Sequence, residues 1–308
     1  MLESGLGEFG NIPIRLTKIK LKNQNYSISV IRDDQILFGL GTKIRKISGF
    51  LKTQNLETSR DIWIWGSLHG NFLASYTYFL KMHGFRVHVL GYSRNLNLLT
   101  ANRVFIESNS HSLRLFSSRN QAFLEWEKIS TQEASDNLRI PEFGFHPTAL
   151  SGLSYLWSQL EKQIPKPKTI FLEIGSGLTF LSAIDFFKDS DTIVCGISVG
   201  EDKNEFMIKK NHYLRSLDLT NENHAKHFIL NPLGKKKFGR ESKRENQMAL
   251  SLYEETGIFF EPVYGIKTWE YLMNPDLLPE KFQQPWVYLH QGGQLNHLDL
   301  ILKTCNIR

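Results

Sequence analysis

Short apolar segments alternate with amphipathic segments along this chain, and that alternation limits the fold more than any other feature of the sequence. The apolar segment at 62–65 is followed by a glycine-containing turn, an amphipathic stretch at 72–83 and a second apolar segment at 87–90. The same order recurs between 170 and 199, where IFLEI and TIVCGISV flank a glycine turn and another amphipathic stretch. Strand–helix–strand units of this kind build parallel sheets. The sequence therefore predicts an α/β fold.

Apolar periodicity predicts the other elements in outline. Extended structure is expected at 11–32 and a last strand at 286–289. The region 201–250 is polar and is expected to be helix or loop. Helices are expected at 42–57, 96–108, 119–136 and 150–163, with a further helix beginning at 268.

Composition limits the class of protein. With 308 residues and 41% hydrophobic content, the chain is long enough for about two domains. A run of about 18 apolar residues is missing, so no membrane interaction is expected. The first ten residues do not resemble a secretory signal. Cys195 and Cys305 are far apart and offer neither a disulfide framework nor metal-ligand spacing. A cytoplasmic protein is expected.

The positive charge of the chain does not by itself indicate a nucleic-acid partner. The net charge is +6, and the densest basic run is Lys235–Lys237, near Arg240, Lys243 and Arg244. No recognition motif accompanies this run, so it is interpreted as a surface loop. The ten histidines show no zinc-binding spacing, and no metal site is expected.

The turn after the apolar segment at 170–174 is a candidate anion site. Gly175, Ser176 and Gly177 lie between a predicted strand and a predicted helix that begins with Leu178 and Thr179. Backbone N–H groups at such a turn, together with the positive end of the helix dipole, bind phosphate or carboxylate groups. A tight turn without a ligand is the simpler alternative.

A second alternative for this turn is the first motif of S-adenosylmethionine-dependent methyltransferases. Those enzymes use an acidic residue at the end of the next strand to hold ribose hydroxyls. Here that strand ends with Gly196, Ile197 and Ser198, and the first carboxylate after it is Glu201. The methyltransferase stays open as a less favoured hypothesis.

Lys43 stands at the predicted start of a helix, after Gly39, Gly41 and Thr42. The positive end of a helix dipole is an unfavourable place for an ammonium group. A surface lysine in a basic helix is the ordinary interpretation. The functional interpretation is a lysine that becomes neutral readily and forms an imine.

Seven motifs in one order resemble the family of 1-aminocyclopropane-1-carboxylate (ACC) deaminase and D-cysteine desulfhydrase. That family belongs to the fold type II pyridoxal-phosphate (PLP) enzymes, the superfamily of tryptophan synthase β. In this chain the motifs are Asp33-Asp34, Gly41-Thr42-Lys43-Ile44-Arg45-Lys46-Ile47, Trp65-Gly66-Ser67-Leu68-His69-Gly70-Asn71, Ile140-Pro141-Glu142-Phe143-Gly144, Gly175-Ser176-Gly177-Leu178-Thr179, Glu255-Thr256-Gly257-Ile258 with Glu261-Pro262-Val263-Tyr264, and His290-Gln291-Gly292-Gly293.

The resemblance implies two three-layer α/β domains with a PLP cleft between them. The large domain would comprise 1–56 plus 160–308, and the small domain 57–159. A homodimer is also implied. By resemblance, Lys43 would form the Schiff base with the cofactor, Asn71 would bind its phenolic oxygen, and residues 175–179 would bind its phosphate. Tyr264 would face the substrate side of the ring, and His290 is a further candidate near the cofactor.

Several positions depart from the family pattern. The serine that acts on substrate in the family is replaced by Gly70, and the neighbouring His69 is a candidate acid or base. Gly265 stands where deaminases have Glu and desulfhydrases have Ser or Thr. Gln291 stands where they have Leu or Thr. Leu178 and Thr42 replace a glycine and an asparagine.

The functional expectation is a PLP-dependent deaminase or lyase of a small amino acid, acting through an external aldimine and a carbanion. A family member that binds PLP without turnover is the alternative. His69, Tyr264 and His290 could each instead be packed residues without a role in chemistry. The helical series Phe72, Tyr76 and Phe79 is expected in the core.

Overall fold

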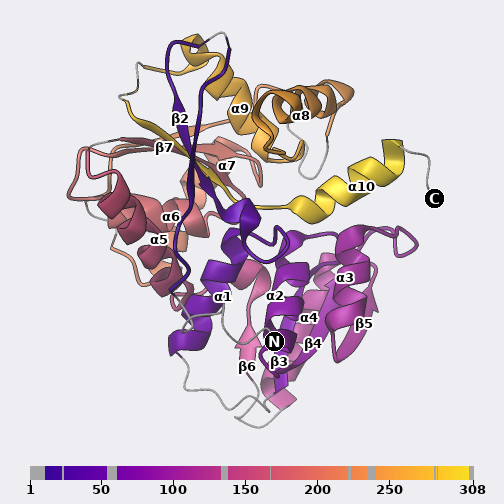
Figure 1. Cartoon of the computed structure of the whole chain (residues 1–308). Coiled ribbons are helices and arrows are strands. Elements are labelled where there is room, and N and C mark those ends of the chain that lie inside the picture. Colours follow the sequence, from indigo (N-terminus) through magenta and orange to yellow (C-terminus); the bar gives the residue numbers. More distant parts are fainter. Residues whose placement is uncertain are drawn as a thin grey trace. The chain divides into compact units, whose positions relative to one another are not determined.

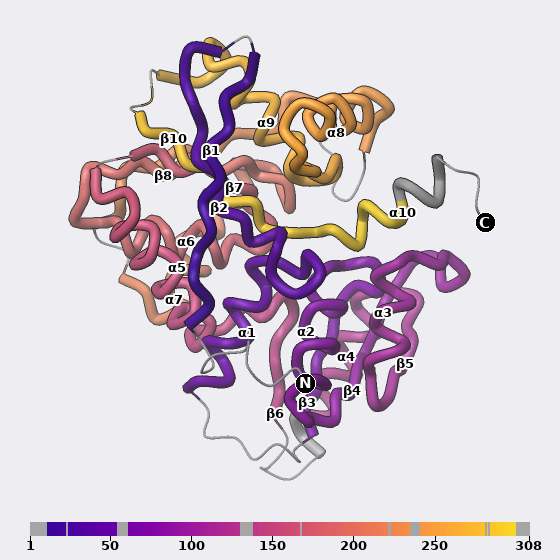
Figure 2. Tube along the Cα trace, in the orientation of Figure 1, coloured from indigo at the N-terminus to yellow at the C-terminus, as the bar shows by residue number. Residues whose placement is uncertain are grey.

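The structure is a computed structural model that describes residues 11–304 except 23, 54–60, 133–137, 167, 221–222, 235–240, 281 and 283. Lys235–Lys237, Arg240 and Cys305 therefore lie outside the described residues. Figures 1 and 2 show the chain, which divides into two units. One contains Ile36–Gly152 and the segment from Gly293 onward, and the other contains Asn11–Gln35 and Leu153–Gly292.

These units have other bounds than the domains expected from the sequence. Residues 36–53 and the C-terminal segment pack with the unit that contains 61–152. The division into the domains 1–56 plus 160–308 and 57–159 stays a prediction.

The first unit is built on a parallel sheet of four strands in the order β5-β4-β3-β6. Ile64 pairs with Val89 on one side and with Ile140 on the other. The strands are β3 (Asp61–Ser67), β4 (Arg86–Tyr92), β5 (Ser112–Phe116) and β6 (Leu138–Ile140). The helices are α1 (Thr42–Thr53), α2 (Asn71–Met82), α3 (Ala101–Asn109), α4 (Arg119–Gln132) and α10 (Gln294–Thr304), with a 3-10 turn at Glu142–Gly144.

Alternating side chains of β3 meet different helices. Trp63 and Trp65 point to the same side and form a buried cluster with Ala122 and Trp126 of α4. Gly66 lies next to Phe72 and Leu73 at the start of α2. Phe72, Tyr76 and Phe79 of α2 are buried, as the sequence predicts for core residues. Helices therefore cover both faces of this sheet.

The second unit is built on a sheet of six strands in the order β1-β2-β10-β7-β8-β9, in which only β1 and β2 pair antiparallel. The strands are β1 (Leu16–Ile19), β2 (Ile28–Arg32), β7 (Thr169–Ile174), β8 (Ile193–Ser198), β9 (His227–Leu230) and β10 (Trp286–His290). The helices are α5 (Ala149–Gln163, within which the two units divide), α6 (Leu178–Phe186), α7 (Lys203–Ser216), α8 (Lys243–Thr256) and α9 (Gly265–Met273), with 3-10 turns at Asp33–Gln35 and Pro275–Leu277.

The central strands of this unit are buried on both faces. Every residue of β7, β8 and β10 is buried, which is the pattern of a parallel sheet between layers of helices. On one face, Glu173 of β7 accepts a hydrogen bond from Thr268 of α9. On the other face, Ile174 of β7 and Phe180 of α6 both lie close to Gly196. The α/β fold predicted from the sequence is confirmed.

The strands that the sequence patterns did not predict are β5, β6 and β9. All three are edge strands. Every residue of β5 and β9 is partly or fully exposed, and β6 has only three residues, so none presents a long apolar run. The sequence patterns also missed α10. Helix α3 begins at 101 rather than 96, because the Thr100 hydroxyl caps it by accepting from the Arg103 N–H at 3.2 Å.

Membrane-spanning character is not found in the described helices: each is too short or too polar to cross a bilayer.

Two glycines allow α1 to pack closely against the first turn of α5. A Cβ at Gly152 would lie 2.0 Å from the Arg45 carbonyl oxygen, and a Cβ at Gly49 would lie 2.7 Å from the Gly152 nitrogen. The Ser151 hydroxyl also donates to the Gly49 carbonyl at 3.3 Å. This backbone contact fixes α1, the helix that carries Lys43.

Gly152→Ala should destabilise the protein, because the added methyl group would collide with backbone atoms rather than with a movable side chain. We expect the free energy of unfolding to fall by about 1–3 kcal/mol, measured by urea denaturation. Gly234→Ala is the matched control, since its Cβ would lie 3.5 Å from the Glu245 carboxylate, an ordinary contact. Equal stability of the two variants would contradict the close packing of α1.

Candidate functional site

The glycine turn between β7 and α6 has the form of an anion site. Gly177 has a φ of 90° and is the N-cap of α6 without a capping side chain. The first N–H groups of a helix have no acceptor within the helix, and the first turn of α6 contains no acidic residue. Leu178 and Thr179 are buried. The backbone at 175–179 can therefore offer N–H donors to a phosphate group.

The position of this turn is set by the segment after β8. The N–H groups of Val199 and Gly200 both donate to the Ile174 carbonyl at 3.0 Å. A Cβ at Gly200 would lie 2.2 Å from the Gly175 carbonyl oxygen, so the two backbones touch. A Cβ at Gly175 itself would meet nothing within 4 Å. The turn is thus supported from one side and open at Gly175, which fits an anion held by backbone groups.

Lys43 is the second residue of α1 and follows a tightly folded loop. Leu37, Phe38, Gly39 and Gly41 of this loop all have positive φ. Lys43 is half-buried, and its helix has no acidic residue in the first turn. The loop is tied to α2 by Ser75, whose hydroxyl contacts the Leu40 carbonyl at 3.3 Å and the Asn71 carbonyl at 2.6 Å. The Lys43 and Asn71 segments are therefore neighbours in the first unit.

Lys46 is a candidate that the sequence patterns did not single out. It lies one helical turn after Lys43 and is buried. Burial, and to a lesser extent the neighbouring Lys43 charge, lower the pKa of its ammonium group to about 7. The spacing of three residues from Lys43 was the available signal. A lysine that is neutral near pH 7 could also form an imine.

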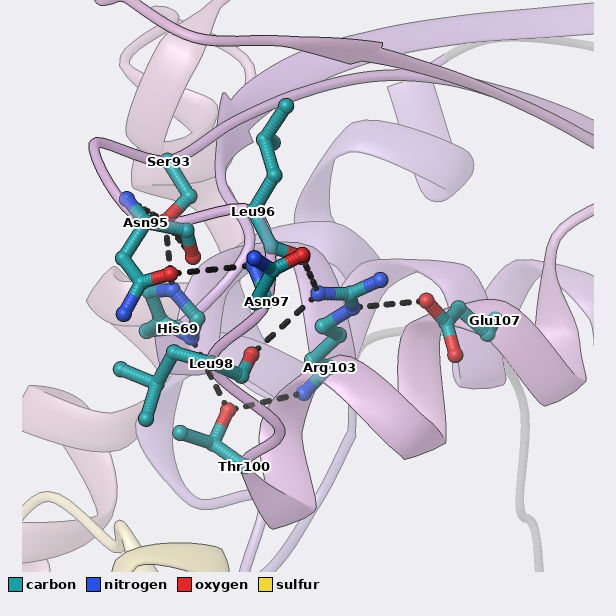
Figure 3. A network of polar contacts seen from close by, with 9 residues as sticks. All are labelled: His69, Ser93, Asn95, Leu96, Asn97, Leu98, Thr100, Arg103 and Glu107. Atoms are coloured by element: carbon teal, nitrogen blue, oxygen red, sulfur yellow. Dashed lines mark hydrogen bonds and ion pairs between the residues drawn. The ribbon is translucent and has the colours of Figure 1, made fainter.

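His69 lies in a hydrogen-bond network that occupies both nitrogens of its ring (Figure 3). Nε2 is 2.8 Å from the Ser93 hydroxyl, which donates to the Asn95 carbonyl at 2.9 Å and so accepts from Nε2–H. Nδ1 is 3.1 Å from the Thr100 hydroxyl and accepts its hydrogen. These bonds assign the neutral Nε2–H tautomer. Burial lowers the pKa of His69, the Arg103 charge lowers it further, and Asp299 opposes the shift.

Arg103 completes this network. Its guanidinium donates to the carbonyls of Leu96 and Leu98 and forms an ion pair with Glu107 at 2.7 Å (Figure 3). The network connects the end of β3 to the loop that precedes α3. Its geometry gives His69 a structural task, and the role of His69 as acid or base stays a prediction.

The loop at 140–144 owes its pattern to packing. The Glu142 carboxylate accepts from the Tyr92 hydroxyl at 2.6 Å and from the Arg119 guanidinium at 2.6 Å. A Cβ at Gly144 would lie 2.1 Å from the Tyr76 hydroxyl, and Gly144 has a φ of 63°. This motif therefore supports the fold.

Glu173 is the centre of the corresponding network in the second unit. Its Oε1 accepts from the Thr268 hydroxyl at 2.6 Å and from the Tyr288 hydroxyl at 2.9 Å. The Gln291 amide donates to the Glu173 carbonyl at 2.8 Å and to its Oε2 at 3.2 Å. Glu173 thus connects the strand before the glycine turn with α9, β10 and the segment after β10. The sequence patterns did not select Glu173 as a site residue.

Tyr264 and Gly265 adjoin this network. Tyr264 is the N-cap of α9, and burial raises its pKa, as does the nearby Glu261 charge. A Cβ at Gly265 would lie 3.2 Å from the Tyr288 hydroxyl, so the tyrosine occupies the space next to this glycine. A side chain at 265 would therefore compete for space with the Tyr288 hydroxyl, which donates to Glu173.

His290 is buried, and both of its ring nitrogens are engaged. Nε2 donates to the Phe259 carbonyl at 2.8 Å, and Nδ1 accepts from the Gly292 N–H at 3.3 Å. The ring also stacks on Phe260, with centroids 5.2 Å apart. These contacts orient the Gln291–Gly293 segment, and direct contact of His290 with a cofactor stays a prediction.

The candidate residues thus form two groups. Lys43, His69 and Asn71 lie in the first unit, and the 175–179 turn, Tyr264 and His290 lie in the second. Among the described residues, no three His, Cys, Asp or Glu side chains form a group that could hold a metal ion.

Comparison with solved structures defines the fold. The structure matches an ACC deaminase homologue with a TM-score of 0.75 at 19% identity, over 96% of this chain and 95% of that one. It also matches O-ureido-L-serine synthase, with a TM-score of 0.67 at 14% identity, over 96% and 93%. A fungal L-serine ammonia-lyase from Rhizomucor miehei matches with a TM-score of 0.64 at 16% identity, over 95% and 98%.

The chain has the fold type II architecture. The fold expected from the sequence motifs is therefore confirmed. No family model and no curated protein sequence matches the chain.

His69→Ala should destabilise the protein, because the Ser93 and Thr100 hydroxyls would each lose a partner in a partly buried place. We expect a loss of about 1–3 kcal/mol in the free energy of unfolding, measured by urea denaturation at pH 7. His212→Ala, at an exposed position of α7, is the control. If both variants unfolded like the parent protein, the structural role of His69 would be excluded.

Glu261 should make the stability of the protein depend on pH. Burial and the Glu173 charge raise its pKa to about 8, against the effect of the Val263, Tyr264 and Gly265 N–H groups, so the folded state keeps a proton that the unfolded state releases at about pH 4.3. The free energy of unfolding should therefore fall as pH rises from about 5 to 8.

Glu261→Gln should flatten this pH dependence, measured by urea denaturation at several pH values. The exposed Glu254→Gln in α8 should keep it. An unchanged slope in Glu261→Gln would show that another group is responsible.

Proposed function

We propose that this chain binds PLP and acts as a deaminase or lyase of a small amino acid. The observation that carries the proposal is the 175–179 turn: an open glycine turn at the start of a helix without first-turn acids, in a chain with the fold type II architecture. Backbone N–H groups at 175–179 would bind the phosphate. Lys43 would hold the cofactor covalently, and the Asn71 amide would bind its phenolic oxygen.

PLP would supply an electron sink for the negative charge that develops next to the substrate's amino nitrogen. The chain's own residues would orient the ring and move protons. Tyr264, at the start of α9, is the proposed substrate-side group. A tyrosine hydroxyl is protonated at neutral pH, and the raised pKa of Tyr264 keeps it so at higher pH, so it can donate a hydrogen bond.

The substrate class is proposed by analogy with the neighbours in fold. Their names refer to ACC, O-ureido-L-serine and L-serine, which are all small amino acids. A homodimer and a cytoplasmic location stay predictions, as does the absence of nucleic-acid and membrane partners.

Binding without turnover is the second candidate, and Gly70 favours it. This position lacks the hydroxyl that acts on substrate in the resembling family, and the neighbouring His69 is committed to Ser93 and Thr100. Ser67 is the nearest alternative hydroxyl residue: its Cβ lies 3.6 Å from the place of a Cβ at Gly70. An active enzyme could use Ser67 in place of the missing serine.

Lys43 can be tested against Lys46. The protein should be loaded with PLP, reduced with borohydride, digested and analysed by mass spectrometry. We expect the reduced cofactor on the Lys43 peptide. Lys43→Ala should lose the visible absorbance of the imine, whereas Lys52→Ala, at an exposed position of the same helix, should keep it. A label on Lys46 would show that Lys46, rather than Lys43, forms the imine. A label on neither lysine would refute the proposal.

Gly175→Ala separates folding from phosphate binding. The methyl group would meet no protein atom within 4 Å, so the thermal midpoint without cofactor should be unchanged. Because the same methyl group would enter the open side of the turn, we expect PLP to bind at least about tenfold more weakly in an absorbance titration, which corresponds to about 1.4 kcal/mol. Unchanged affinity would remove the anion site from the proposal.

Turnover is tested by adding D-cysteine, L-cysteine, D-serine and ACC to the PLP-loaded protein and measuring released keto acid. Turnover of one of these would support the deaminase or lyase, and Ser67→Ala should then lower its rate. Spectral change on amino-acid addition without keto acid would favour binding without turnover.

A further inference from the structure

Three asparagine amides meet at the N-terminal ends of α2 and α3 in the first unit. The Asn102 Nδ2 group lies 3.0 Å from Asn71 Oδ1, 3.0 Å from Asn296 Oδ1 and 3.1 Å from the His69 carbonyl oxygen. Asn102 is 1% exposed. Helix α10 contributes Asn296 to this cluster, and its Asp299 accepts from the Ala101 N–H at 2.8 Å. The cluster is therefore enclosed by α2, α3 and α10.

The His69 carbonyl determines which way the Asn102 amide points. Side-chain amides can be turned over, which exchanges their oxygen and nitrogen. A backbone carbonyl is only an acceptor, so it requires the Nδ2 group of Asn102 on its side. Asn102 Oδ1 is then left buried without a hydrogen-bond partner among the described residues. The amide keeps this orientation although one of its atoms is unsatisfied.

The orientation of Asn102 in turn determines that of Asn71. Asn71 presents Oδ1 to the Asn102 donor, so its own Nδ2 group points away from the cluster. The reverse orientation would place two NH2 groups against each other. The His69 carbonyl thus sets the orientation of the Asn102 amide, and Asn102 sets the orientation of the Asn71 amide.

We propose that Asn102 is a positioning residue that holds the Asn71 amide with its NH2 group turned outward, ready to donate to the phenolic oxygen of the cofactor. This inference rests on the proposed function, which assigns that oxygen to Asn71. Asn102 itself does not touch the cofactor; it acts through Asn71.

The test is a double-mutant cycle on PLP affinity, followed by absorbance titration. Asn102→Asp replaces the donor with a carboxylate that faces three oxygen atoms, so Asn71 should turn its NH2 group inward. Asn102→Ala removes the donor without adding charge. Asn109→Ala is the matched control on α3, because among the described residues that amide bonds to the Phe105 carbonyl of its own helix, at 2.7 Å. Thermal melting without PLP checks the fold of each variant.

Asn71→Ala and Asn102→Asp should each weaken PLP binding by about 10- to 100-fold, the usual worth of a hydrogen bond to a charged oxygen. Asn102→Ala should have a smaller effect in the same direction, and Asn109→Ala none. In the Asn71→Ala background, Asn102→Asp should cause no further loss, because the residue through which it acts is gone.

The outcomes separate the inference from the proposed function. If the parent protein does not bind PLP, the proposed function and this inference both fail. If the parent protein binds PLP, and Asn102→Asp and Asn102→Ala both bind it as tightly as the parent does, only the inference fails. Additive losses in Asn71→Ala/Asn102→Asp would also overturn it, because they would show that Asn102 acts independently of Asn71. If Asn102→Asp does not fold, Asn102→Ala with the same cycle decides.

Discussion

The buried Glu173 carboxylate is the interaction on which the second unit depends. It is the second-last residue of a fully buried strand that leads into the glycine turn, and it accepts hydrogen bonds from Thr268, Tyr288 and Gln291. A buried carboxylate is costly unless it is hydrogen-bonded, so these partners cannot be removed independently. The turn, the start of α9 and the segment after β10 are therefore held in one arrangement by one side chain.

The two candidate histidines show why a residue type at a motif position does not define its chemistry. His69 and His290 both stand in segments that resemble an active-site pattern. In each, both ring nitrogens are occupied by hydroxyl or backbone partners of the same unit. Such rings are well suited to hold loops in place. Among the described residues, the groups better suited to chemistry include the half-buried Lys43, the buried Lys46, Tyr264 and the backbone of the 175–179 turn.

Much of the fold and part of the candidate site could be predicted from the sequence. The buried central strands are apolar runs in the sequence, and Gly175 and Gly177 indicate the turn between β7 and α6. Edge strands such as Ser112–Phe116 and His227–Leu230 were not predicted, because their apolar stretches are short and only partly buried. Glu173, Lys46 and Asn102 were also missed, since each gains its importance from partners that lie far away in the sequence or from burial.

The sequence by itself determined the alternation of strands and helices, the glycine turn and the lysine at the start of a helix. These are local properties, because backbone preference and apolar periodicity act over a few residues. Only the tertiary structure decided which polar groups are committed to one another. The tautomer of His69 depends on Thr100, and the direction of the Asn71 amide depends on Asn102, each 31 residues away in the chain. Glu173 and its partner Gln291 are 118 residues apart. Buried polar groups form hydrogen bonds with the partners that the fold places next to them, and a local sequence pattern does not identify those partners.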